Sequence, residues 1–99
     1  DATTHPPESL EQATALLQAL AHPVRLRILE GLLSGQCCVG NMVDCLDLPQ
    51  PLVSRHLAIL RAAGVLEAIP MGRKRSYRVV HPAVAGVLHS VFANHRSET

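Results

Sequence analysis

Three cysteines lie close together near the middle of this 99-residue chain. Cys37 and Cys38 are adjacent, and Cys45 follows a few positions later. Thiolates react with oxidants and reactive sulfur, and they bind soft ions such as Zn(II). An odd number of cysteines with an adjacent pair does not fit the disulfide framework of a secreted domain. The cysteines therefore indicate thiol chemistry in a reducing cytoplasm.

The spacing of these thiols limits how they can bind one ion. If Cys38 and Cys45 share a helix, they are separated by about 10.5 Å along its axis. Thiolates on one Zn(II) must lie within about 4 Å of each other. A three-thiolate site would need Cys37 and Cys38 to fold back from a turn, or a second protomer to contribute. The alternatives are a buried, inert Cys45 and an inert pair in a turn.

A second group of polar residues follows Pro49. Gln50, Ser54 and Arg55 supply an amide, a hydroxyl and a guanidinium within one short stretch, and Arg61 comes two turns later. Such groups bind base edges and phosphate oxygens in the major groove of a duplex. The start of a helix adds attraction for phosphate. This stretch is therefore a candidate nucleic-acid reader.

Positive charge is concentrated beside this stretch, although the net charge of the chain is only +1. Residues 50–80 hold six of the nine Lys and Arg residues, with Glu67 as their only acidic residue. Arg73, Lys74 and Arg75 lie in a predicted turn, from which they can reach phosphates or a minor groove. A local basic patch favours a polyanionic partner. A solvated surface face is the alternative.

Hydrophobic periodicity and turn residues predict the elements that position these groups. Ser9 and Gln12 form a capping-box pattern at a helix start, Pro23 suits a first helical position, and Gly64 suits a helix end. The predicted elements, in chain order, are a helix 9–20, a helix from Pro23 to about Leu33, a short helix 39–46, a helix from Pro51 to Gly64, strands 65–69 and 76–80 around a turn 70–74, and a last helix 82–95.

This order is mainly α-helical with a small β-hairpin wing: a winged helix-turn-helix, α-α-α-α-β-β-α. We expect a flexible N-terminal arm over 1–8, one DNA-binding and dimerisation domain over 9–95, and a C-terminal tail over 96–99. Helices 9–20 and 82–95 have wider apolar faces than a domain of this size can easily cover. We therefore expect a homodimer through the first and last helices. Packing of both helices on their own core is the alternative.

Other classes of protein fit the sequence poorly. No apolar run approaches the roughly 20 residues of a membrane span, and no signal-peptide pattern is present, so no membrane partner is expected. An enzyme is not expected, because there is no nucleophile with an adjacent base, no Cys-x-x-Cys pair and no glycine-rich phosphate loop. A protein-interaction module that does not bind DNA remains a further alternative.

Three stretches of the chain resemble the ArsR/SmtB family of bacterial winged-helix repressors. They run from Ala19 to Leu29, from Pro49 to Leu66 and from Gly72 to Arg78. The resemblance implies a homodimer that binds double-stranded operator DNA and is released by an inducer. It also implies that Gln50, Ser54, Arg55 and His56 contact DNA.

The sensor sites of this family are only partly matched. Many members carry Cys-Val-Cys-Asp where this chain has Cys38, Val39, Gly40 and Asn41. We therefore expect thiol chemistry with an oxidant or reactive sulfur at Cys37 and Cys38. The alternatives are a response to a metal or metalloid (As(III), Zn, Cd or Cu) through Cys37, Cys38 and Cys45, or to a small molecule. His95 at the end of the last helix and Glu98 in the tail form a second candidate metal pair at i, i+3 spacing.

Overall fold

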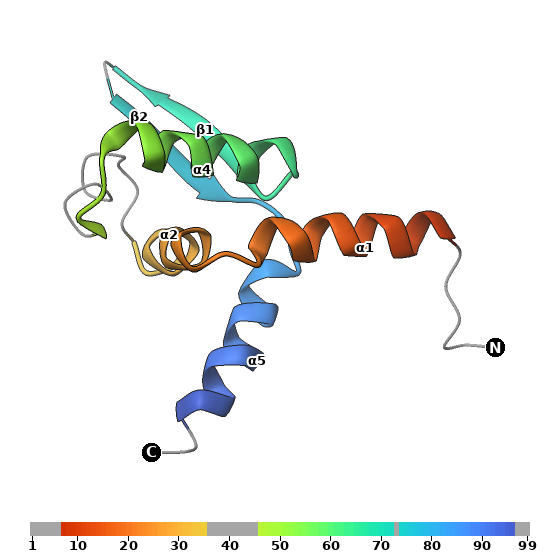
Figure 1. Ribbon diagram of the computed structural model, residues 1–99. Helices are drawn as coiled ribbons and strands as arrows, with labels where there is room; N and C mark the ends of the chain where they lie inside the picture. The colour runs from red at the N-terminus through yellow and green to blue at the C-terminus, as the bar shows by residue number, and fades with distance from the viewer. Residues whose placement is uncertain (1–6, 36–45, 73, 97–99) are drawn as a thin grey trace.

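The computed structural model describes residues 7–35, 46–72 and 74–96 of the chain. Its elements, in order, are α1 (Pro7–Leu20), α2 (Pro23–Leu33), α4 (Gln50–Ala62), β1 (Leu66–Met71), β2 (Lys74–Val79) and α5 (Val84–Arg96) (Figure 1). The winged helix-turn-helix expectation is confirmed in these elements. The predicted helix 39–46 lies outside the described residues except for Leu46, as do Cys37, Cys38 and Cys45.

The helix starts follow the prolines of the sequence. α1 begins at Pro7, so the expected start at Ser9 is wrong, and Pro7 and Glu8 belong to the helix instead of the arm. Proline suits a first helical position because its φ is already helical and its missing N–H is not needed there. α2 begins at Pro23 as predicted, and Nδ1 of His22 caps it by accepting from the backbone N–H of Val24 at 3.1 Å.

α4 carries the candidate reading residues, and its inner face is apolar. The helix begins at Gln50, one residue before the predicted start at Pro51. Val53, Leu57 and Leu60 are fully buried, as their spacing predicted. Burial of each of these side chains contributes about 1.5–3 kcal/mol to stability. The opposite face of α4 is therefore fixed outward.

A glycine in the left-handed region ends α4, at the position that the sequence predicted. Gly64 has φ 77°, and its N–H donates to the carbonyl of Arg61 at 3.0 Å. The N–H of Val65 donates to the carbonyl of Leu60 at 3.0 Å. These two bonds form a Schellman motif, which turns the chain sharply from α4 into β1.

The hairpin is tighter than the sequence suggested. β1 and β2 pair antiparallel from Leu66 opposite Val79 to Met71 opposite Lys74, so only two residues form the turn, against the five expected. Gly72 has φ 62°, a conformation that short hairpin turns require. Pro70 is tolerated within β1 because each strand of a two-stranded sheet has a free edge.

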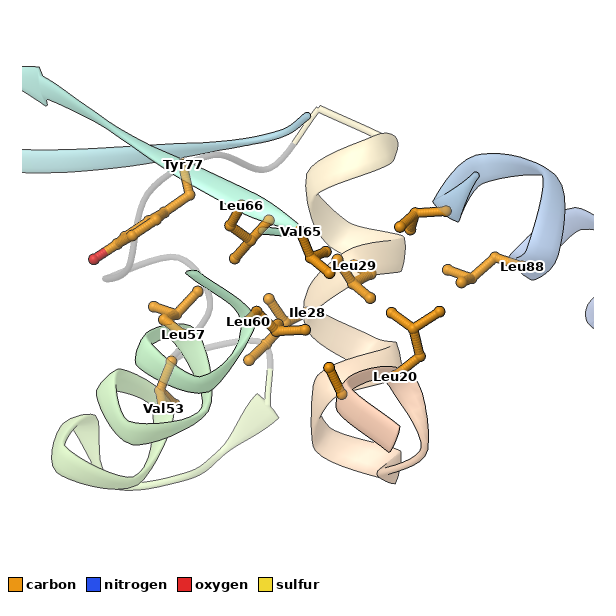
Figure 2. Close-up of a cluster of buried hydrophobic side chains, with 12 residues drawn as sticks. Leu20, Ile28, Leu29, Val53, Leu57, Leu60, Val65, Leu66, Tyr77 and Leu88 are labelled. Carbon is orange, nitrogen blue, oxygen red and sulfur yellow. The ribbon is translucent and has the colours of Figure 1, made fainter. Parts of the chain in front are cut away.

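α2 runs through the middle of the core. Ile28 and Leu29 are fully buried. Side chains of α4 and the hairpin lie on one side of α2, while Leu20 and Leu88 lie on the other (Figure 2). The last helix begins at Val84, two residues after the predicted start. Within the described part of the chain, no helix has the length and apolarity needed to cross a membrane.

The Schellman motif gives a direct test of how α4 is ended. We expect Gly64→Ala to lower the free energy of unfolding by about 1 kcal/mol, because an L-residue is strained in the left-handed region. No atom lies within 4 Å of an added Cβ, so backbone strain is the only cost. Urea unfolding measures the change. Gly64→Asn is the matched control and should lose less, since asparagine tolerates this conformation. An alanine variant as stable as the parent would contradict the assignment.

Candidate nucleic-acid interface

Polar and small residues lie on the exposed side of α4, whereas its buried residues are apolar except for His56. Gln50, Ser54, Ala58 and Arg61 are all exposed, and they recur at the spacing of one helix face. At 3.6 residues per turn they fall within about 80° of arc. We call these four residues the outward stripe of α4. Arg55 is also exposed and lies beside the stripe.

The outward stripe continues onto the hairpin. Ala58 and Arg61 border an open hollow of about 540 Å³ that β1 closes on its other side with Leu66, Glu67 and Ala68. α4 and the hairpin therefore present one continuous surface at one end of the molecule (Figure 1). A surface of this kind, a helix with small and polar outward residues next to a hairpin, is suited to a DNA groove and its flanking phosphates.

The basic residues of the hairpin are only partly described. Arg75 is exposed on β2. Lys74 pairs with Met71 at the end of the hairpin, and its side chain is not described. Arg73 lies outside the described residues. The two described strands thus form the hairpin of the predicted wing, and Arg75 is an exposed cation on it.

Arg78 was not singled out from the sequence. Its Nη2 lies 2.6 Å from Oε2 of Glu67 on the neighbouring strand, and both side chains are largely exposed. An exposed pair of this kind contributes about 0–1 kcal/mol to stability. The strand alternation with buried Tyr77 was the available signal that Arg78 faces solvent.

His56 departs from the sequence prediction that it contacts DNA. Its side chain is 6% exposed and faces α2 instead of solvent. Burial, together with the positive charges of His22, Arg25 and Arg55, lowers the pKa of His56. The signal was present in the sequence: Val53, His56, Leu57 and Leu60 follow the i, i+3, i+4, i+7 pattern of a buried face. A buried ring cannot reach a base edge, so His56 is removed from the interface.

The candidate sensor residues are not placed. Cys37, Cys38, Cys45 and Glu98 lie outside the described residues, and the side chain of His95 in α5 is not described. Among the residues that are described, no three His, Cys, Asp or Glu side chains come together as a metal site would require.

Comparison with known proteins agrees with the fold. Residues 22–68 match the arsR family of bacterial regulatory proteins. The transcriptional repressor SmtB of Mycobacterium tuberculosis is 45% identical over 89 residues, which are 90% of this chain and 66% of SmtB. The chain therefore spans about two-thirds of the length of that relative.

Two solved structures are similar to this chain in both fold and sequence. HlyU from Vibrio cholerae superposes with a TM-score of 0.81 at 30% identity, over 89% of this chain and 99% of HlyU. The homodimeric winged helix-turn-helix DNA-binding domain Mb0332 from Mycobacterium bovis has a TM-score of 0.81 at 25% identity, over 99% of this chain and 93% of that domain.

The fold and the surface of α4 and the hairpin define a winged helix-turn-helix protein of the DNA-binding class. Within that class, this chain belongs to the arsR family of bacterial regulatory proteins.

Proposed function

We propose that this chain is a transcriptional repressor that binds operator DNA as a homodimer and is released by an inducer. The observation that carries the proposal is the outward stripe of α4, which is exposed while Val53, His56, Leu57 and Leu60 of the same helix are buried. Its relative SmtB is a transcriptional repressor, and the similar domain Mb0332 is homodimeric and DNA-binding. Such a regulator works where the chromosome is, in the bacterial cytoplasm, and its role is binding and not catalysis.

The residues divide the work of recognition by their chemistry. Gln50 and Ser54, in the first turns of α4, are suited to base edges and nearby phosphates. Ala58 is small enough to let the duplex approach. Arg55 and Arg61 on α4, with Arg75 on the wing, supply positive charge for phosphates. Lys74, the first residue of β2, and Arg73, which precedes it in the sequence, are proposed to join them.

The dimer is proposed to form through α1 and α5. Both helices extend away from the layer of α4 and the hairpin (Figure 1), and both expose large apolar side chains. Leu10 and Leu17 of α1 are 55% and 53% exposed, and Val91 of α5 is 50% exposed. An apolar groove of about 170 Å³ lies between the two helices, lined in part by Leu17, Leu20, Val87 and Val91. Apolar surface of this kind favours a partner.

A second copy is the partner that fits best. A two-fold dimer pairs the same face of each protomer. It would also present two α4 helices to half-sites about 34–36 Å apart or a multiple of that spacing. The predicted operator is therefore a pseudo-palindrome.

The inducer is proposed to act through Cys37 and Cys38, with an oxidant or reactive sulfur as the reactant. The support is the adjacent thiol pair in the sequence. A soft metal or metalloid bound by Cys37, Cys38 and Cys45 is the alternative, with His95 and Glu98 as a second candidate pair. A small-molecule inducer is the second alternative.

Removal of two reading residues tests the DNA-binding surface. We expect Ser54→Ala with Arg55→Ala to lower affinity at least tenfold for a duplex that the parent protein selects from a random library, because base and phosphate contacts are both lost. The double variant should remain a dimer. Arg27→Ala removes the same charge from an exposed site on α2 and is the control. Fluorescence anisotropy at several salt concentrations measures affinity, and the slope against log salt should fall by about one. Equal losses for the two variants would contradict the proposal.

A charge on the outer face of α1 tests the dimer. We expect Leu17→Glu to shift the protein to a folded monomer, since the buried carboxylate would lack a partner in the dimer but is solvated in the monomer. Ile59→Glu is the control, because Ile59 is also exposed and apolar but lies on α4. Sedimentation equilibrium measures the mass. A Leu17→Glu variant that remains dimeric would place the interface elsewhere.

A release screen tests the inducer. The screen compares peroxide and persulfide with arsenite, Zn(II), Cd(II) and Cu(I). Any of these reagents that releases the DNA is expected to act through the thiols. The variant Cys37→Ser with Cys38→Ser should then lose the response while keeping DNA affinity. Retention of every response would exclude both thiol mechanisms and favour a small molecule.

A further inference from the structure

Three basic residues meet where the end of α1, the start of α2 and the middle of α4 come together. The rings of His22 and His56 lie 4.4 Å apart between centroids, tilted by 45°. Nη1 of Arg25 lies 3.4 Å from Nδ1 of His56. His56 is one of the buried side chains of α4, so this contact is with its inner face.

Arg25 also reaches in the other direction, to the end of α1. Its Nε donates to the carbonyl of Ala19 at 2.6 Å, and its Nη2 donates to the carbonyl of Gln18 at 3.3 Å. These carbonyls lie in the last turn of α1, where a cation is favoured, and the carbonyl of Gln18 also accepts from the backbone N–H of Ala21 at 3.3 Å. One guanidinium therefore contacts the end of α1 and the inner face of α4.

The contact with His56 depends on the charge of the imidazole. A guanidinium only donates hydrogen bonds, so this contact is a hydrogen bond only when Nδ1 of His56 is the unprotonated acceptor. Protonation would turn Nδ1 into a donor and place a second cation against Arg25. The titratable groups that act on His56 are His22, which caps α2, Arg25 of α2 and Arg55 of α4. All three are basic, and α1 offers backbone carbonyls to Arg25. The contact therefore holds only while His56 is neutral.

We propose that Arg25 is a positioning residue for DNA recognition: through the neutral ring of His56 it fixes the angle of α4 against α1. This inference rests on the proposed function. In a dimer joined through α1, the angle between α1 and α4 decides where each reading helix lies on the duplex. α4 has 13 residues and is about 20 Å long, so a tilt of about 5° moves its far end by nearly 2 Å. That displacement exceeds the tolerance of a hydrogen bond to a base edge.

Acid should weaken the contact. Because the pKa of His56 is lower in the folded protein than its usual value of 6.5, the unfolded chain binds more protons as pH falls below 6.5. The stabilising contribution of neutral His56 is therefore complete above about pH 6.5 and is lost as pH falls toward the lowered value. Affinity for a chosen DNA sequence should fall at the lower end of this range, where His56 of the folded protein takes up its proton.

The test compares Arg25→Gln with Arg27→Ala, which removes a charge from the same helix without touching α1 or α4. The probe is the duplex that the parent protein selects from a random library, with a scrambled duplex beside it. We expect Arg25→Gln to lose about tenfold or more in affinity for the selected duplex, and to match Arg27→Ala on the scrambled one. Circular dichroism should show a folded protein. Equal losses for both variants on the selected duplex would overturn the proposal.

A second comparison keeps the proposal testable if Arg25→Gln does not fold. The ratio of affinities for the selected duplex at about pH 7.5 and about pH 5.5 is measured for the parent and for His56→Asn, whose amide oxygen takes the place of Nδ1 without titrating. We expect the parent to lose several-fold on acidification and the ratio for His56→Asn to stay near one, whatever its absolute affinity. The same ratio for both proteins would overturn the proposal. A parent protein that selects no duplex at all would instead contradict the proposed function.

Discussion

The packing of α4 against α2 is the contact on which the other features of this protein depend. Val53, Leu57 and Leu60 of α4 are buried with Ile28 and Leu29 of α2 (Figure 2). Burial of Val53, Leu57 and Leu60 fixes which side of α4 faces the core. The residues of the outward stripe must therefore face solvent. Truncation of a core leucine such as Leu57 costs about 2–5 kcal/mol in comparable domains, a large share of the stability of a domain this small.

The core also divides the surface into two parts with different physical character. On one side, α4 and the hairpin expose amide, hydroxyl and guanidinium groups. On the other, α1 and α5 expose leucine and valine side chains that the small core does not cover. The polar, basic surface and the apolar surface do not overlap. The proposed regulator could therefore bind DNA with one and a second copy of the chain with the other at the same time. Arg25 is placed between them, with hydrogen bonds to α1 and a contact with α4.

The sequence predicted most of the fold because its signals were local. Proline at position 23, glycine at position 64 and the stripe of Val53, Leu57 and Leu60 each act through the backbone or one helix face, and the structure confirms all three. The start of α1 was missed because a capping pattern at Ser9 competed with a proline two residues earlier. The hairpin turn was predicted too long because strand pairing extends through Pro70.

The site was predicted less completely, for a different reason. The exposure of Gln50, Ser54 and Arg55 follows from periodicity, and it is observed. The burial of His56 was missed because the family resemblance placed it among the DNA contacts, although its spacing matched the buried stripe. Its contact with Arg25 joins residues far apart in the sequence and depends on how α2 and α4 cross, which no local pattern encodes.

In the proposed complex, the outward stripe of α4 and the hairpin lie against DNA. The most direct measurement is an NMR titration of isotope-labelled protein with the duplex it selects from a random library. We expect amide shifts to concentrate at Gln50, Ser54, Arg55 and Arg61 and along β2, with α1 and α5 little changed. Shifts concentrated on α1 and α5, with α4 unaffected, would contradict this placement.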